Sequence, residues 1–293
     1  MLEPETWSEL ADDVLRFPVP TLTLPPATRT NHFLVGTDRG WVLLDAAAAD
    51  DSAATDLLDT LRQVVGRGAI RAIVLSHHHQ DHCNRALWLA ERLDVDEVWA
   101  HEHTWAHLTD EQVPAALRRV LPAPSDAVDG KVVRVDEPTT WGLRTLHTPG
   151  HASGHVVVQA AGSSHVLAAD LVAGVGTILI DPDDGDVGEY VDSLRRVQTL
   201  GAPRLHPAHG HTIDDVDERL EFYIQHRLMR HHRVIDALDR SGRTLDDIAR
   251  RAYADSPTAM VVLTERSTLA HLRWMQRLGE ARCSEDGWWM KGG

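Results

Sequence analysis

The stretch IVLSHHHQDHCN, residues 73–84, runs from an apolar segment directly into four histidines and one aspartate. The residues that lead into it, AIRAIVLS at 69–76, are mostly small or branched and apolar, which predicts a buried strand. Side chains that follow a buried strand lie at its end, and alternate residues of an extended segment face the same side. We therefore expect a cluster of metal ligands at one edge of a sheet, formed by His77, His79, Asp81 and His82.

The residue types of this cluster indicate which metals it suits. Imidazole and carboxylate ligands favour zinc and also suit manganese or iron, whereas structural zinc sites are rich in thiolates. A single histidine is usually a satisfied polar residue, but this spacing after an apolar strand favours ligation. Four ligands in one short segment can serve two ions. His78 falls between the candidates, and we expect it to point away from them.

The composition is that of an ordinary globular protein. The chain has 293 residues, of which 43% are hydrophobic and 25% are charged, enough for one large domain and one small one. It contains no apolar run of membrane-spanning length, and its first residues, MLEPETWSEL, lack the pattern of a signal peptide. Only Cys83 and Cys283 are present, so there is no disulfide framework. We therefore expect a cytoplasmic protein with no membrane partner.

The charge is strongly acidic and unevenly distributed. The net charge of -15 weighs against a general polyanion binder, because affinity for nucleic acid is built largely from lysine and arginine. Residues 226–293 nevertheless carry 12 Lys+Arg against 9 Asp+Glu, which leaves 17 against 35 in residues 1–225. This shift, together with a change to helical spacing near Asp217, predicts a catalytic domain at 1–216 and a helical domain at 217–293.

The first part of the chain is rich in expected strands, separated by helices and turns. A helix is expected over 84–93, directly after the histidine cluster. The other strands are expected at 32–36, 41–45, 97–101, 131–135, 155–160 and 165–170.

The last part of the chain has helical spacing. Helices are expected over 219–238, over 244–253 with Thr244 as the N-cap, and over 266–278, ending at Gly279. A hairpin that turns at Asp286-Gly287 follows them. Three helices and a hairpin predict a winged helix. Its third helix carries Arg266, Arg273 and Arg277, which would contact DNA in a recognition helix or else form a solvated face.

Three further motifs follow the histidine cluster in a fixed order. They are TLHTPGHASGH at 145–155, HVLAADLV at 165–172 and LHPAHGH at 205–211. With the opening TNHFLVG and WVLLDA, they resemble the metallo-β-lactamase superfamily. The resemblance implies a four-layer αβ/βα sandwich with metals at one edge. It implies that the metal ligands are His77, His79, His151, Asp81, His82, Asp170 and His209.

The resemblance also assigns roles to individual side chains. Asp170 is implied to bridge the two ions, and Asp45 to support a ligand from behind. His206 and His211 flank His209, but the P-A-H-G pattern favours His209. The remaining histidines are expected in loops, on the surface or in supporting positions. These are His101, His103, His107, His147 and His155.

The segments 181–200 and 226–238 narrow the resemblance to the lactamase-beta-2-type branch, whose members append a winged-helix domain. Two departures stand out. The chain has CNRA at 83–86, where the family often has Gly-Gly, and Ala169 replaces a frequent glycine before Asp170. Neither change removes a metal ligand, but both leave the identity of the substrate open.

The resemblance implies a dinuclear hydrolase, with zinc as the expected metal and manganese or iron as alternatives. Its metal-bridging hydroxide would attack a thioester or related acyl ester, and Asp81 would orient that hydroxide. The alternative is a metal-dependent endoribonuclease acting on single-stranded RNA, which the acidic catalytic part disfavours. A small acyl molecule is thus the expected partner, and a homo-oligomer is possible.

An intact ligand series argues against a vestigial site in a regulatory protein, and the chain has no room for the flavin domain of a di-iron redox protein.

Overall fold

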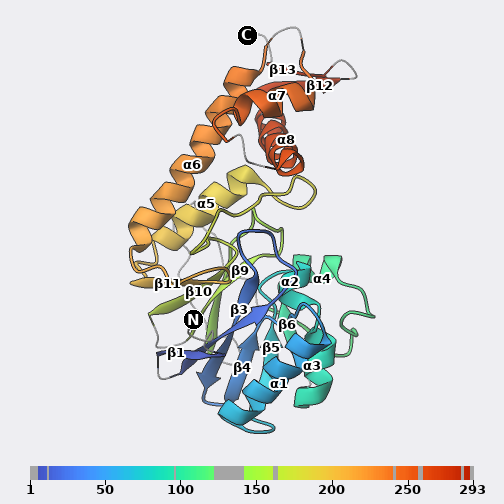
Figure 1. Ribbon diagram of the computed structural model, residues 1–293, viewed down its shortest axis with the longest axis vertical. Coiled ribbons are helices and arrows are strands. Elements are labelled where there is room, and N and C mark those ends of the chain that lie inside the picture. Colours follow the sequence, from blue (N-terminus) through green and yellow to red (C-terminus); the bar gives the residue numbers. More distant parts are fainter. Residues whose placement is uncertain are drawn as a thin grey trace. The chain divides into compact units, whose positions relative to one another are not determined.

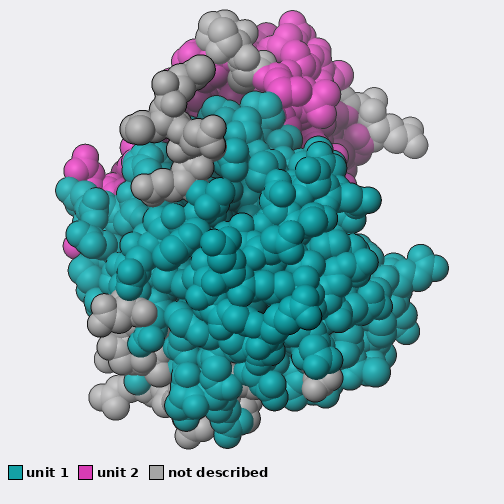
Figure 2. All heavy atoms as spheres, turned by 60° about the horizontal axis from the view of Figure 1, so that its bottom comes forward, with its two compact units in different colours: residues 1–148, 154–177, 199–216 teal, residues 149–153, 178–198, 217–293 magenta. Residues whose placement is uncertain are grey.

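The computed structural model describes residues 6–11, 13–95, 97–121, 142–160, 164–239, 242–256, 260–284 and 287–290. Contacts divide the chain into two units, coloured teal and magenta in Figure 2. The first unit comprises residues 1–148, 154–177 and 199–216, and the second comprises 149–153, 178–198 and 217–293. The predicted division into domains at 216/217 stays a prediction. Two internal segments, 149–153 and 178–198, join the second unit.

The first unit contains a seven-stranded sheet in sequence order (Figure 1). Its first four strands pair antiparallel, and the pairs from β4 onward are parallel. The expected strands at 32–36, 41–45, 69–76 and 97–101 lie in this sheet. The strands are β1 (Ser8–Ala11), β2 (Val14–Pro20), β3 (Arg29–Thr37), β4 (Gly40–Leu44), β5 (Ile70–Val74), β6 (Val98–Ala100) and β7 (Arg118–Val120).

Two helices cover one face of this sheet, α1 (Asp51–Val65) and α3 (Ala86–Leu93) (Figure 1). Asp50 caps α1 by accepting the backbone N–H of Ala53 at 2.9 Å. The helices bury an apolar face against one set of alternating strand residues. This core contains Leu57 and Leu61 of α1, Leu89 of α3, and Leu34, Leu43 and Ile73 of the sheet.

The opposite face of the sheet packs on a second, four-stranded sheet in the order β11-β10-β9-β8. Residues of both sheets share one buried core, among them Phe33, Leu44, Val74, Val158 and Leu167. The expected strand at 131–135 lies outside the described residues. The strands of this sheet are β8 (Leu143–His147), β9 (Val156–Ala160), β10 (His165–Ala169) and β11 (Arg204–Pro207).

The second unit is mainly helical. Its elements are α5 (Val187–Gln198), α6 (Val216–Ala237), α7 (Leu245–Ala252), α8 (Val261–Leu278), β12 (Ala281–Ser284) and β13 (Gly287–Met290). Thr244 caps α7 by accepting the N–H of Asp247, which confirms the expected N-cap. Gly279 ends α8 with a φ of 75°, a conformation that glycine adopts without strain.

The C-terminal helices and the hairpin share a core that includes Val234, Ile248, Leu272, Met275 and Trp288. Their order is the predicted one, and the winged-helix assignment stays a prediction. The expected turn at Asp286-Gly287 falls partly outside the described residues. Helix α6, 22 residues long, is rich in charged side chains. Neither it nor any other helix in the described part of the chain is long and apolar enough to cross a membrane.

Candidate metal centre

The histidine motif begins where β5 ends. Ser76 still pairs with the other sheet, since its carbonyl accepts the N–H of Val156 at 2.9 Å. His79 has extended backbone (φ -62°, ψ 146°) and serves as the N-cap residue of the short helix α2 (Gln80–Cys83). His79 therefore lies on extended chain, whereas the two candidates that follow it, Asp81 and His82, lie on one helical turn.

The first two candidates face each other. His77 Nε2 lies 2.9 Å from His79 Nδ1. His77 Nδ1 lies 3.0 Å from the Ser76 hydroxyl, which orients the ring from behind. The predicted third partner, His151, belongs to the second unit, and its grouping with these two histidines stays a prediction.

Four other candidates converge within the first unit. His82 Nε2 lies 3.5 Å from Asp170 Oδ1 and 3.9 Å from Asp81 Oδ2. His209 Nε2 lies 3.3 Å from Asp170 Oδ1 and 3.4 Å from Asp81 Oδ2. Two imidazoles and two carboxylates thus direct their polar atoms at one point. We call Asp81, His82, Asp170 and His209 the carboxylate cluster.

Parallel pairing of β10 and β11 brings Asp170 and His209 together from distant parts of the sequence. Each follows the end of its strand, and the N–H of Ala208 binds the carbonyl of Ala169 at 3.0 Å. Ala169 has a φ of 43°, in the left-handed region. That conformation gives a physical reason for the glycine that the family often has before the aspartate.

A buried carboxylate supports His82 from behind. Asp45 Oδ2 lies 2.7 Å from His82 Nδ1, and Asp45 also accepts the N–H of Ser76 at 2.8 Å. With Nδ1 engaged by Asp45, the Nε2 atom of His82 is the one directed at the cluster. The supporting role expected for Asp45 agrees with this contact.

His155 supports Asp170 rather than joining the cluster. Its Nε2 accepts the backbone N–H of Asp170 at 3.1 Å, and its Nδ1 lies 2.8 Å from the Thr148 hydroxyl. Burial is the main cause that lowers the pKa of His155, to about 3. His155 is therefore neutral at pH 7, as an acceptor for a backbone N–H must be.

Opposite charges control ionisation in the carboxylate cluster. Burial by itself raises the pKa of Asp81, but the positive charge of His82 and the hydrogen bond from His209 lower it to about 2. Burial opposes the charged form of His209, yet the carboxylates of Asp170 and Asp81 raise its pKa to about 10. The carboxylates therefore stay ionised at neutral pH and attract positive charge.

The donor set fits a divalent transition metal. Two imidazoles and two carboxylates are ligands that zinc, manganese and iron accept. The buried Nε2 atom of His82 makes no hydrogen bond to any described residue, although it lies among carboxylates. A metal ion would satisfy this atom and offset the two negative charges of Asp81 and Asp170.

His151 is held by its own surroundings in the second unit. Its Nδ1 lies 2.8 Å from the carbonyl oxygen of Leu179, to which it donates when that nitrogen carries the proton. This contact leaves Nε2 as the nitrogen that can bind a metal.

Two supporting residues were not anticipated from the sequence. Asn31 donates from its amide to the carbonyls of Pro207 and Gly210, each at 2.9 Å, and so holds the turn that carries His209. The carbonyl of Arg29 lies 3.0 Å from His209 Nδ1. Both residues lie on β3, whose first four residues, RTNH, are all polar, so the sequence did not single out Asn31 for this role.

The flanking histidines serve other contacts. His206 Nε2 lies 2.7 Å from His165 Nδ1, and the two rings stack. His78 stacks on His107 with ring centroids 4.1 Å apart, consistent with a side chain turned away from the ligands.

A third group, formed by His101, His103 and His147, places its nitrogens within 4.8 Å of one another. Stacking and capping contacts account for the position of His101. Its ring stacks on His147 with centroids 3.8 Å apart. Its Nδ1 accepts the N–H of His103 at 3.2 Å and caps helix α4 (Glu102–His107), which places the proton of the neutral ring on Nε2.

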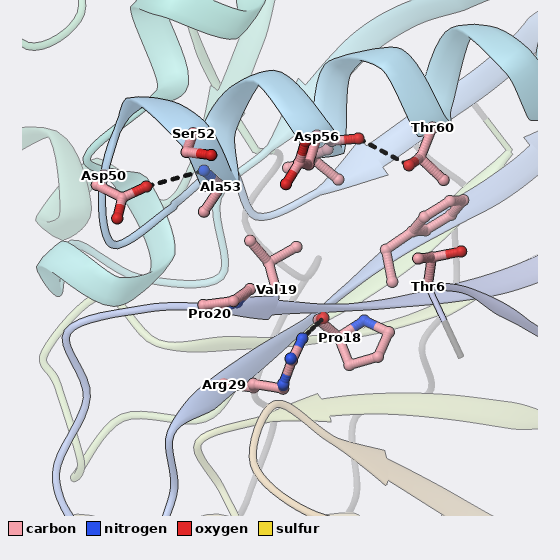
Figure 3. Close-up of a pocket in the computed structure, with 12 residues that line it drawn as sticks. Thr6, Pro18, Val19, Pro20, Arg29, Asp50, Ser52, Ala53, Asp56 and Thr60 are labelled. Carbon is pink, nitrogen blue, oxygen red and sulfur yellow. Dashed lines mark hydrogen bonds between the residues drawn. The ribbon is translucent and has the colours of Figure 1, made fainter. Parts of the chain in front are cut away.

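A pocket of about 420 Å³ lies between β2 and α1 (Figure 3). Phe17, Val19 and Leu57 give it an apolar floor, and the carboxylates of Asp50 and Asp56 line it as well. Arg29 lines the same pocket and donates to the carbonyl of Pro18 at 2.9 Å (Figure 3). None of its lining residues is a candidate metal ligand.

Comparison with known proteins identifies the family to which the chain belongs. The family model of the metallo-beta-lactamase superfamily matches residues 25–209, more than half of the chain. The chain therefore belongs to the metallo-β-lactamase superfamily, a family of hydrolases, as its motifs indicated.

Individual relatives cover most of the chain. A beta-lactamase-like protein 2 homolog of Caenorhabditis elegans is 28% identical over 241 residues, 79% of this chain and 73% of its own. An atrochrysone carboxyl ACP thioesterase of Aspergillus chevalieri is 29% identical over 216 residues, 72% of this chain and 61% of its own. The crystal structure of a metallo-beta-lactamase family protein from Thermus thermophilus matches with a TM-score of 0.72 at 20% identity, covering 97% of this chain and 100% of that one. The structural match confirms the expected fold.

Proposed function

We propose that this chain is a dinuclear metal-dependent hydrolase, with zinc as the metal, that acts on a thioester or related acyl ester. The carboxylate cluster carries the proposal, because two imidazoles and two ionised carboxylates converge on one point in the first unit. In this proposal His77, His79 and His151 would hold one ion. Asp81, His82 and His209 would hold the other, and Asp170 would be a ligand as well.

The chemistry supplied by two bound divalent ions is a water of lowered pKa and a polarised acyl carbonyl. The chain's own groups then position and move protons. A carboxylate beside bound cations stays ionised at neutral pH, so Asp81 would accept a hydrogen bond from the attacking water and orient it. Asp45 keeps His82 in one orientation, with Nε2 directed at the cluster.

A thioester suits this arrangement because its leaving group needs no strong acid. As water attacks the acyl carbon, the C–S bond breaks and a thiolate departs, and a thiol has a pKa of about 8.5. One curated relative is named a thioesterase, which supports this substrate class.

The arginines of α8 weigh against the RNA alternative. Arg266 pairs with Asp181 and Asp183, and Arg277 pairs with Asp186. Arg273 binds Asp183 at 3.3 Å and also the carbonyl of Pro182. Carboxylates within the same unit therefore already neutralise the charges that a phosphate backbone would need.

Hydrolysis rates test the proposal. We would measure kcat/KM on a panel of acyl-thioesters, lactones, a β-lactam and single-stranded RNA, with chelator-treated protein as the control. The proposal expects metal-dependent thioester hydrolysis to exceed RNA cleavage at low and at moderate salt. Faster RNA cleavage that falls steeply with added salt would instead support the endoribonuclease. The cytoplasmic location and a homo-oligomer stay predictions.

A further inference from the structure

The loop that carries His151 belongs to the second unit by its contacts. The carbonyl of Gly150 accepts the N–H of Asp186 at 2.8 Å, and the carbonyl of Pro149 accepts the hydroxyl of Ser193 at 2.7 Å. On the other side of His151, the N–H of Ser153 binds Asp184 at 3.1 Å. The loop is thus fixed on both sides to the segment 178–186 and to α5.

Close packing reinforces these hydrogen bonds. Gly150 has a φ of 126°, and a Cβ atom there would overlap the backbone of Tyr190 in α5. Only glycine allows this approach and this backbone conformation together. The loop therefore moves with the start of α5.

Arginines from the C-terminal helices hold the segment 178–186 in turn. Arg266 forms a bidentate pair with Asp181 and a second pair with Asp183, at 2.6 Å. Arg277 pairs with Asp186, the residue whose N–H binds the loop, and Arg227 of α6 binds the carbonyl of Ile178. Leu179, whose carbonyl receives His151 Nδ1, lies between these anchors.

We propose that the arginines of α8 are positioning residues for His151. They act through the segment 178–186, which holds the Leu179 carbonyl and the two flanks of the loop. The proposal rests on the proposed function, in which His151 is a ligand of the first metal. It makes the C-terminal helices part of the metal site, because one ligand depends on their ion pairs.

The effect of losing these ion pairs should be selective. The carboxylate cluster lies wholly in the first unit and has its own supports, Asp45 behind His82 and Asn31 beneath His209. Loss of the α8 arginines should therefore weaken binding of one ion and leave the other. Each exposed ion pair is weak by itself, but bidentate pairs that share partners are stronger. Loss of the supports of a ligand typically lowers metal affinity by about 10- to 100-fold.

The test compares the full chain with the variant R266Q/R273Q/R277Q, with R250Q as the matched control. Arg250 also forms exposed pairs, but its partners Asp246 and Asp247 lie on α7, outside the loop and the segment 178–186. We would titrate zinc and, separately, cobalt, whose visible spectrum reports each site. The proposal expects the triple variant to bind one ion about tenfold more weakly, near the lower end of that range, and the other as before, and expects no change in R250Q. Unchanged affinity for both ions in the folded triple variant would overturn it.

Hydrogen exchange gives a readout that does not depend on metal. The triple variant should exchange faster at residues 149–153 and 178–186 and keep wild-type protection at 76–83. Unchanged exchange in the loop would also overturn the proposal. If the triple variant does not fold, both measurements are made on R277Q alone. Asp186 pairs with Arg277 through its side chain and binds the carbonyl of Gly150 through its backbone N–H, so it links α8 directly to the loop.

Failure of the proposed function would look different. In that case the wild-type protein would bind fewer than two ions, or His151→Ala would bind both as tightly as wild type. The exchange measurement would still show whether α8 positions the loop.

Discussion

The carboxylate cluster and the His151 loop are supported in contrasting ways. His82 is fully buried, with a carboxylate behind it, and it lies in a unit built from two packed sheets. The His151 loop depends on the segment 178–186, whose anchor Arg266 is 36% exposed and pairs with Asp183, which is 68% exposed. Buried, sheet-supported ligands resist salt and local opening better than ligands that depend on surface ion pairs. If both groups bind metal as proposed, the difference predicts that the two groups of ligands have unequal stability.

The largest expected effect is on catalysis. Asp81→Ala should lower kcat by about 10²- to 10⁴-fold in metal-loaded protein, because it removes both a ligand and the group that orients the attacking water. Some metal should remain through His82, Asp170 and His209. The measurement is turnover on an acyl-thioester together with metal content. Wild-type turnover in the metal-loaded variant would reject the role of Asp81.

The second prediction concerns the support of the carboxylate cluster. Asp45→Asn removes the charge behind His82, and asparagine still tolerates the φ of 64° at this position. We expect metal affinity to fall by about 10- to 100-fold at one site. Metal titration and thermal unfolding measured together would separate this from misfolding. If both ions bind as in wild type, the contact between Asp45 and His82 has no part in ligation.

The third prediction concerns how the stability of the second unit depends on pH. Burial lowers the pKa of His226 and of His231 in α6 to about 4, so the folded second unit holds them neutral. Between the unfolded value of 6.5 and about 4 the unfolded chain binds more protons, so stability falls as pH falls through this range. Thermal unfolding followed from pH 7 to pH 4 should show this loss, and His231→Gln should reduce it. An equal loss in the variant would exclude His231 as a cause.

The smallest effect concerns the two cysteines, one in each unit. Cys83 is buried and donates to the carbonyl of His78, and burial raises its pKa to about 12. Cys283 is exposed. A thiol reagent should therefore modify one cysteine in the native protein and both after denaturation, with little change in activity. Rapid native modification of Cys83 would mean that α2 opens readily.

Local patterns predicted much of the site. The end of β5 and the histidine spacing after it are encoded within a dozen residues, and the family resemblance pointed to Asp170 and His209, whose side chains the structure brings together. The support of Asp45 followed from family resemblance. The positions of α3, α6, α7 and α8 were predicted from apolar spacing, and the N-cap of α7 from Thr244, whereas α1 and α5 were not predicted.

Long-range contacts could not be predicted in the same way. The sequence placed three arginines on α8 but did not indicate that acidic residues 181–186 are their partners, because the paired residues lie 83 to 91 positions apart. For the same reason, the assignment of 149–153 to the second unit was missed. The spacing of residues along the chain predicts which side chains share one face of a helix or strand. It does not predict contacts between residues far apart in the sequence, because these depend on how the elements pack.

Metal content tests the central claim most directly. Elemental analysis of the purified protein should find close to two zinc ions per chain. The variant His77→Ala/His79→Ala should retain close to one, because the carboxylate cluster keeps its own ligands and supports. Full occupancy in the double variant, or no bound metal in the wild-type protein, would contradict the account of two ions held by two differently supported groups.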